Sequence, residues 1–142
     1  MLEVFPVKRE SWPADIGSLP PIQAYVETRV AGAGIPLERV VQVAIAVEEA
    51  VMNIISHAYA TTLKGEIAIE FEENFHTVVI RIIDTGIPFD PLGTPAPDTG
   101  LDLMDRPVGG LGVVMIRKFM DGVTYERTDN ENILGLVINK TE

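Results

Sequence analysis

The sequence contains no cysteine and few basic residues among its 142 positions. The absence of cysteine excludes disulfides and thiol catalysis, and it fits the reducing environment of the cytoplasm. The formal net charge is −10, from 21 acidic and 11 basic residues. This balance argues against a nucleic-acid partner, because binding to a phosphate backbone depends on clustered Lys and Arg. The excess of acid fits either plain solubility or an acidic recognition surface.

A long apolar run is also lacking. No run approaches the roughly 20 residues that a membrane-spanning helix needs, so we expect no membrane partner. The N-terminal sequence MLEVFPVKRES has no basic start followed by an apolar stretch, so we expect no secretory signal. The length, with 46% hydrophobic and 23% charged residues, predicts one globular domain over residues 1–142 with a single core.

Apolar periodicity predicts helices and antiparallel strands joined by short turns. The expected helices cover residues 18–32, 36–60 and 109–121, and the expected strands cover residues 2–8, 66–73, 77–84, 123–128 and 132–140. Ser18 is the expected N-cap of the first helix. Because the strands pair antiparallel, we expect the helices to cover only one face of the sheet.

One long segment, between Asp84 and Gly109, has no clear secondary structure beyond a short helical turn expected near residues 101–104. It holds five of the ten prolines, namely Pro88, Pro91, Pro95, Pro97 and Pro107. Unstructured connections of this length inside a compact domain are uncommon and are usually either functional or disordered. We interpret residues 88–108 as a lid over a binding site.

The helix expected over residues 36–60 carries a polar stripe beside its apolar face. That apolar face comprises Val40, Val41, Ala44, Val47, Val51, Ile54, Ile55 and Ala58. Glu49, Asn53 and His57 recur every four residues, so they align along one side of the helix. A carboxamide oxygen suits Mg²⁺, and a carboxylate one turn away could accept a proton beside that metal. Taken singly, each residue also fits a structural role.

Two further motifs follow in the sequence. DTGIPFDP (84–91) places Asp84 at the end of a buried strand, where its carboxylate could accept a hydrogen bond from the amino group of adenine. Gly86 leaves room for the base beside the backbone. The glycines at 109, 110 and 112 open a helix, where unpaired backbone N–H groups could approach phosphate. Taken alone, the DxG pattern is more often a plain turn, and the glycine pattern is at least as typical of a structural turn.

Together the three motifs resemble those of the GHKL ATPase superfamily. They are E-x-x-x-N-x-x-x-H-A-Y (49–59), D-x-G-x-P-F-D-P (84–91) and G-G-L-G-x-x-x-I (109–116). More narrowly, the chain resembles the RsbW-type anti-sigma-factor serine/threonine-protein kinases. The resemblance implies an α+β two-layer sandwich, the Bergerat fold, with a mixed, mostly antiparallel sheet and helices on one face.

The resemblance also implies roles for individual residues. Glu49 would be the general base, and Asn53 would bind the Mg²⁺ that bridges the ATP phosphates. Asp84 would bind the adenine amino group beside Gly86, while His57 would touch phosphate or fix the lid. The residues that would hold phosphates through their backbone are Gly109, Gly110, Leu111 and Gly112.

The implied partners are a sigma factor, a STAS-domain anti-anti-sigma factor that is phosphorylated, and a second copy of the chain bound through the bare sheet face. One departure concerns the last strand, where many relatives carry a threonine or serine near the adenine. The aligned residue here is taken to be Gly135, which has no hydroxyl, so a water would replace that contact.

Other functions fit part of the pattern. A nucleotide-gated binding module without transfer activity would use Asn53 and Asp84 in the same way. The catalytic domain of a sensor histidine kinase is disfavoured, because no phospho-acceptor helical hairpin is expected before the first strand. Gyrase-type and chaperone-type ATPases would need further domains.

Overall fold

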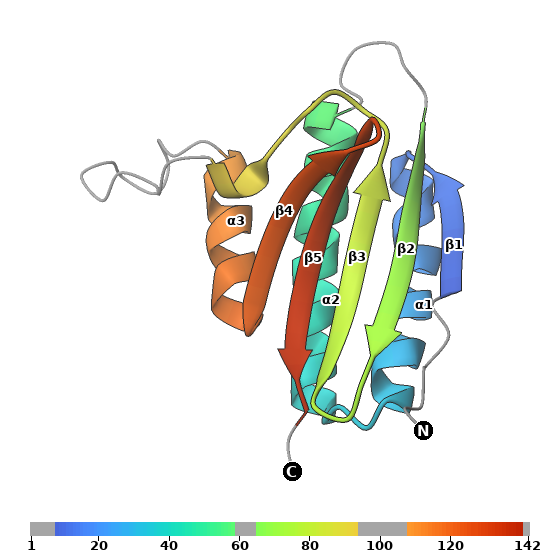
Figure 1. Cartoon of the computed structure of the whole chain (residues 1–142), viewed down its shortest axis with the longest axis vertical. Helices are drawn as coiled ribbons and strands as arrows, with labels where there is room; N and C mark the ends of the chain where they lie inside the picture. The colour runs from blue at the N-terminus through green and yellow to red at the C-terminus, as the bar shows by residue number, and fades with distance from the viewer. Residues whose placement is uncertain (1–7, 59–64, 94–107, 141–142) are drawn as a thin grey trace, which may run out of the picture.

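The computed structural model describes residues 8–58, 65–93 and 108–140, which form a two-layer α+β sandwich (Figure 1). The strands are β1 (Lys8–Pro13), β2 (Glu66–Glu73), β3 (Thr77–Asp84), β4 (Gly122–Thr128) and β5 (Glu131–Asn139). The helices are α1 (Leu19–Gly32), α2 (Leu37–Asn53) and α3 (Val108–Phe119). The strands form one sheet in the order β1-β2-β3-β5-β4, and every described pair is antiparallel. The helices lie on one face of this sheet, as predicted.

The β2–β3 hairpin has the predicted boundaries, and the final hairpin agrees to within one residue at each end. The first strand is the exception. The structure places β1 at Lys8–Pro13, and of the predicted residues 2–8 only Lys8 is described. β1 pairs with β2 at the edge of the sheet, where Pro13 is tolerated because an edge strand needs fewer backbone donors.

Helix α1 begins close to the expected position, but without the expected cap. Ser18 occupies the N-cap position, yet its side chain makes no capping hydrogen bond. Pro20 and Pro21 lie in the first turn, where no backbone donor is lost. The buried residues Ile22, Val26 and Val30 recur every four positions and pack into the core.

Helix α2 is the central helix of the molecule, and its apolar face differs from the predicted one at Val41. Val43 is fully buried, whereas Val41 is 50% exposed on the opposite side of the helix. By length and composition, Leu37–His57 could cross a membrane, which corrects the expectation that no run is long enough. Its apolar character is accounted for by packing, since Val47 and Val51 are fully buried in the core against the sheet.

The alternation of side chains along β3 and β5 decides which residues face the helices. Asp84 pairs with Asn132, and both are buried on the helix-covered face with Leu134 and Leu136. Gly135 pairs with Arg81 and therefore lies on the opposite, open face of the sheet. The expectation that Gly135 lies near the adenine is thus wrong, because alternate residues of a strand point to opposite faces of the sheet, and Gly135 points away from the face that carries Asp84. Asn132 is the residue of β5 beside Asp84.

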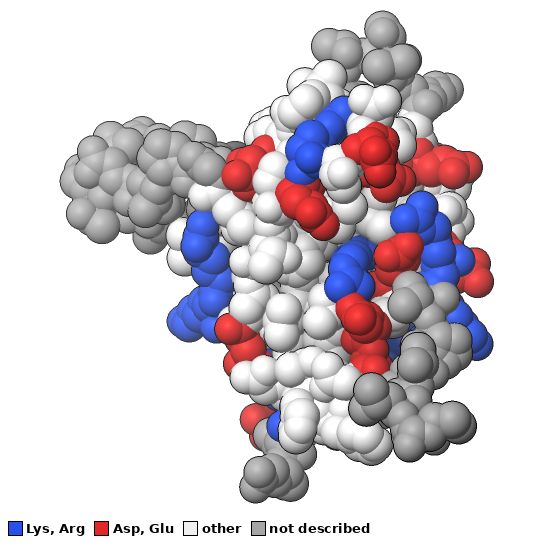
Figure 2. Space-filling view, in the orientation of Figure 1, with Lys and Arg blue, Asp and Glu red and all other residues white. Residues whose placement is uncertain are grey.

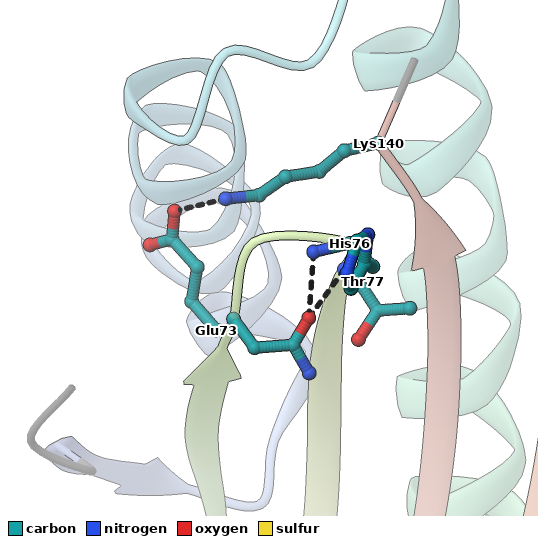
Figure 3. Close-up of polar contacts among 5 residues, drawn as sticks. Glu73, His76, Thr77 and Lys140 are labelled. Atoms are coloured by element: carbon teal, nitrogen blue, oxygen red, sulfur yellow. Dashed lines mark hydrogen bonds and ion pairs between the residues drawn. The ribbon is translucent and has the colours of Figure 1, made fainter. Parts of the chain in front are cut away.

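Tight turns fix the register of both hairpins. Asp129 and Asn130 have φ values of 50° and 63°, which is the left-handed conformation that a two-residue hairpin turn requires. In the β2–β3 turn, the Asn74 carboxamide oxygen accepts hydrogen bonds from the backbone N–H groups of His76 and Thr77 (Figure 3). Lys140, just past β5, donates to the Glu73 carboxylate at 2.6 Å and joins the strands at this end.

Candidate functional site

The elements that carry the three motifs meet at one end of the sheet (Figure 1). Strand β3 ends there at Asp84, and β5 begins there at Glu131. Helix α2 ends at the same place and continues into a π-helical turn, η2 (Ile54–Ala58), while α3 begins beside it. A π-helical turn is rare and often lies at a functional site. The fold therefore brings together three segments that are far apart in the sequence.

A small cavity lies between α2 and the sheet at this end. It is lined by Ala50, Asn53, Ile54, Ile82, Asp84, Phe89, Pro91, Tyr125, Asn132 and Leu134. Two predicted site residues, Asn53 and Asp84, thus line the same cavity from opposite layers. Its volume is about 20 Å³, which is enough for a water molecule but not for a purine. A nucleotide base can enter only if part of the wall moves.

Asp84 is a buried carboxylate, only 4% exposed. Its Oδ1 atom accepts hydrogen bonds from the Gly86 backbone N–H and from the Asn132 side chain, both at 2.9 Å. Burial raises the pKa of the Asp84 carboxyl above its usual value, while the hydrogen bonds from Asn132 and Gly86 and the charge of Arg127 oppose that rise. Such a group gains from a further hydrogen-bond donor, and the adenine amino group is one.

Asn53 is the second polar residue of the cavity wall, and it is 9% exposed. Its side-chain nitrogen is buried and has no hydrogen-bond partner among the described residues. An unpaired buried donor costs free energy, so this nitrogen is available to an acceptor such as a phosphate oxygen. The other atom of the carboxamide, its oxygen, would fit Mg²⁺ as a single ligand, because Mg²⁺ keeps several waters and takes its other ligands from phosphates. The described residues contain no cluster of three or more acidic or histidine side chains that would hold a metal alone.

Glu49 lies one helical turn before Asn53 on α2 and is partly exposed. It is not among the residues that line the cavity. Its carboxylate is therefore outside the described cavity wall, and its partial exposure leaves it accessible to a group that approaches from solvent.

His57 lies in η2 and is exposed. Its ring stacks on Phe89, with centroids 4.7 Å apart and an interplanar angle of 16°. Phe89 belongs to the segment interpreted as the start of the lid, so His57 contacts that segment, as one of its two expected roles requires. Residues 94–107, including the helical turn expected at 101–104, lie outside the described part of the chain.

The three glycines of the last motif lie within α3, in its first turns, rather than in a turn before it. Gly109, Gly110 and Leu111 thus belong to the N-terminal end of the helix, where backbone N–H groups lack partners within the helix. Helix α3 packs against α2. The phosphate-binding role of this segment stays a prediction.

Several residues of the site were not identified from the sequence. Asn132 and Tyr125 line the cavity, and Arg127 donates to the Gly86 carbonyl at 2.7 Å. All three lie on the helix-covered face of the last hairpin. The signal that could have found them is the alternation along that hairpin, counted from the turn at Asp129 and Asn130.

Comparisons with known proteins agree with this architecture. The sequence matches the family model described as "Histidine kinase-like ATPase domain" over residues 12–138. The chain therefore belongs to the histidine kinase-like ATPase domain family. A solved structure of the RsbU and RsbW domains of a Mycobacterium tuberculosis protein has a TM-score of 0.66, covering 96% of this chain and 34% of that chain. At 16% identity this likeness shows the fold.

Curated relatives include three bacterial regulators. The serine/threonine-protein kinase BtrW of Bordetella bronchiseptica is 33% identical over 89 residues, or 63% of each chain. The serine-protein kinase RsbW of Listeria monocytogenes is 34% identical over 96 residues, which is 64% of this chain and 60% of that protein. An anti-sigma F factor of Clostridium beijerinckii is 34% identical over 111 residues, covering 73% and 72% of the two chains. The chain thus spans less than two thirds of the length of BtrW and RsbW, and the expected similarity to RsbW-type proteins is confirmed.

Proposed function

We propose that this protein is an ATP-dependent protein-serine kinase that also acts as an anti-sigma factor. In this proposal it sequesters a sigma factor and phosphorylates a STAS-domain anti-anti-sigma factor in the cytoplasm. The names of the relatives, serine-protein kinase and anti-sigma F factor, support both activities. The cofactors would be ATP and Mg²⁺.

The observation that carries the proposal is the shared cavity of Asn53 and Asp84. Asn53 presents a buried carboxamide with an unpaired nitrogen from the helix layer, and Asp84 presents a buried carboxylate from the sheet layer. The first suits the metal–phosphate end of ATP, and the second suits its adenine end. Bound Mg²⁺ would supply charge neutralisation of the phosphates.

Glu49 would serve as the general base for the transfer. It would accept the proton of a serine hydroxyl on the partner, whose oxygen forms a bond to the γ-phosphorus. The bond from the γ-phosphorus to the oxygen bridging to the β-phosphate breaks, and ADP leaves with that oxygen. Phosphoryl transfer needs little covalent chemistry from the protein, so positioning and charge neutralisation are the main contributions.

Glu49→Gln tests this role, with Glu48→Gln as the matched control because Glu48 is the exposed neighbour on the same helix. We expect Glu49→Gln to bind ATP as the parent does, measured by calorimetry. Transfer of labelled phosphate to a STAS-domain protein should fall about 100-fold or more, the usual contribution of a general base. Unchanged transfer would remove Glu49 from the mechanism. If the parent protein binds ATP but transfers no phosphate, the chain is instead a nucleotide-gated binding module.

A further inference from the structure

Asn132 is the centre of a buried hydrogen-bond network on the sheet side of the cavity. Its side-chain nitrogen donates to Asp84 Oδ1 at 2.9 Å and to the Ile87 carbonyl at 2.8 Å. Its oxygen accepts from the Tyr125 hydroxyl at 2.5 Å and from the Phe89 backbone N–H at 3.3 Å. Both donors and both acceptor positions of the carboxamide are therefore used. Asn132 is 3% exposed.

This network permits only one orientation of the Asn132 amide. If nitrogen and oxygen exchanged places, the oxygen would face the acceptors on Asp84 and Ile87. The nitrogen would then face the Phe89 N–H, which is itself a donor. Burial, and next the nearby charge of Asp90, raise the pKa of Tyr125, so its hydroxyl stays protonated and donates. The amide is thus locked from both sides.

The locked amide determines which carboxylate oxygen of Asp84 is available. Within the described residues, this carboxylate accepts two hydrogen bonds, from the Gly86 backbone N–H and from the Asn132 side chain, and Oδ1 is the acceptor of both. A carboxylate oxygen has two lone pairs, so Oδ1 is saturated. Oδ2 is left as the atom of Asp84 that can accept a donor from a base in the cavity.

The same residues also fix the backbone that follows Asp84. The Asn132 side chain donates a hydrogen bond to the Ile87 carbonyl and accepts one from the Phe89 backbone N–H, and Arg127 donates to the Gly86 carbonyl. This part of the cavity wall is held by three backbone contacts from the last hairpin. The side chain of Phe89, in the same segment, stacks on the ring of exposed His57. Widening of the cavity is therefore expected from side chains at the rim and not from the turn after Asp84.

We propose that Asn132 is a positioning residue for adenine recognition: it holds the Asp84 carboxylate so that only Oδ2 faces the base, and it thereby sets selectivity for a purine that carries a 6-amino group. Asn132 acts through Asp84 and does not hydrogen-bond the base, because its own hydrogen-bonding capacity is exhausted. Leu134, the next residue of β5 on this face, has no hydroxyl to take over. The inference rests on the proposed nucleotide site.

The experiment compares binding of ATP and of ITP, which carries a keto group in place of the 6-amino group, to the full chain by calorimetry. We expect Asn132→Leu to weaken ATP binding about tenfold, because a hydrogen bond to a charged group is lost. ITP binding should change little, so the ratio of the two affinities falls. Asn139→Leu is the matched control, since Asn139 is an exposed residue at the far end of the same strand.

A second readout needs no nucleotide. Titration of the Asp84 carboxyl carbon by NMR should show a higher midpoint in Asn132→Leu than in the parent, because a donor to the carboxylate is gone. If the leucine variant does not fold, Asn132→Ser decides by the same readouts, since one hydroxyl cannot donate to both Asp84 and Ile87.

The outcomes separate the two proposals. A parent protein that binds neither ATP nor ITP contradicts the proposed function, while the titration still tests the link between Asn132 and Asp84. A parent that prefers ATP, with the same preference and the same Asp84 midpoint in the folded Asn132 variant, would overturn the positioning role alone.

Discussion

At the scale of single residues, Asp84 combines a cost in stability with the recognition role proposed for it. The carboxylate is buried, and burial is the largest influence on its raised pKa. A raised pKa in the folded state means that the folded protein holds a proton that the unfolded chain has already released. Between the two pKa values, the unfolded chain binds fewer protons, so the free energy of unfolding falls as the pH rises.

Asp84→Asn should remove this cost while keeping the hydrogen bonds to its side-chain oxygen. Without nucleotide, we expect the variant to gain stability relative to the parent as the pH rises from about 4 through the folded pKa of Asp84. Thermal unfolding across that pH range measures the difference. The Gly86 and Asn132 donors need only an oxygen acceptor, which asparagine supplies.

The same substitution should weaken ATP binding by about tenfold or more, because the charged acceptor for the amino group is lost. GTP binding should be affected less, since the new amide can donate to the keto oxygen of guanine. Equal affinity of the parent and the variant for ATP would contradict the assignment of Asp84 to adenine. If the difference in stability between the variant and the parent did not change with pH, the ionisation of Asp84 could not be its cause.

At the scale of elements, much of the fold follows from periodicity in the sequence. The alternation of apolar and charged residues in 66–73 and 77–84 gives the exact hairpin, and the four-residue spacing of Ile22, Val26 and Val30 gives α1. These signals are local, because each strand or helix has one buried face. Likewise, Asn53 and Asp84 were predicted as site residues, and the structure places both at one cavity.

The parts that could not be predicted depend on contacts between elements. Alignment of the last strand with relatives placed Gly135 near the adenine, but which residues of that strand face the helices depends on the register across β3 and β5. The network around Asn132 has the same origin, since Tyr125, Asn132 and Asp84 come from three strands. The glycines at the start of α3 look like a turn because glycine is a poor helix former.

Gly135→Ala provides a test of this register. A Cβ atom at Gly135 would lie 2.5 Å from Thr124 Oγ1 on the neighbouring strand, so the threonine would have to move. We expect a loss of about 0.5–1.5 kcal/mol in the free energy of unfolding, because the exposed Thr124 side chain must leave its rotamer. The double variant Gly135→Ala with Thr124→Ala should recover most of it. Denaturant unfolding measures both.

Nucleotide binding should not change in Gly135→Ala, because Gly135 lies on the open face and the cavity lies on the other. A large loss of ATP affinity in the folded variant would instead support the original placement of Gly135 near the base.

At the scale of the whole molecule, the open face of the sheet is the surface without a helix layer (Figure 1). Acidic and basic side chains lie next to one another on it, beside a broad uncharged area (Figure 2). Arg9 on β1 contacts Glu70 at 2.7 Å and Glu131 at 3.6 Å. Val79 and Val137, which are apolar residues on the same face, are partly exposed. Charges of both signs around apolar residues suit a surface that pairs with a copy of itself.

The homodimer that the family resemblance implies would form through this face, and the Val79→Glu variant tests that arrangement. Val79 lies on the open face next to Val137, and both are partly exposed. A carboxylate buried in the interface without a partner is costly, so we expect the dimer to dissociate. Sedimentation velocity measures the change. Val114→Glu is the matched control, because Val114 is 41% exposed on α3, in the helix layer.

ATP affinity is the accompanying measurement, because it distinguishes loss of the interface from loss of the fold. Val79 and the cavity lie on opposite faces of β3, so Val79→Glu should bind ATP as the parent does while sedimenting as a monomer. Val114→Glu should remain dimeric. A parent protein that sediments as a monomer at every concentration tested, or a Val79→Glu variant that remains dimeric, would show that the open face does not pair two copies of the chain.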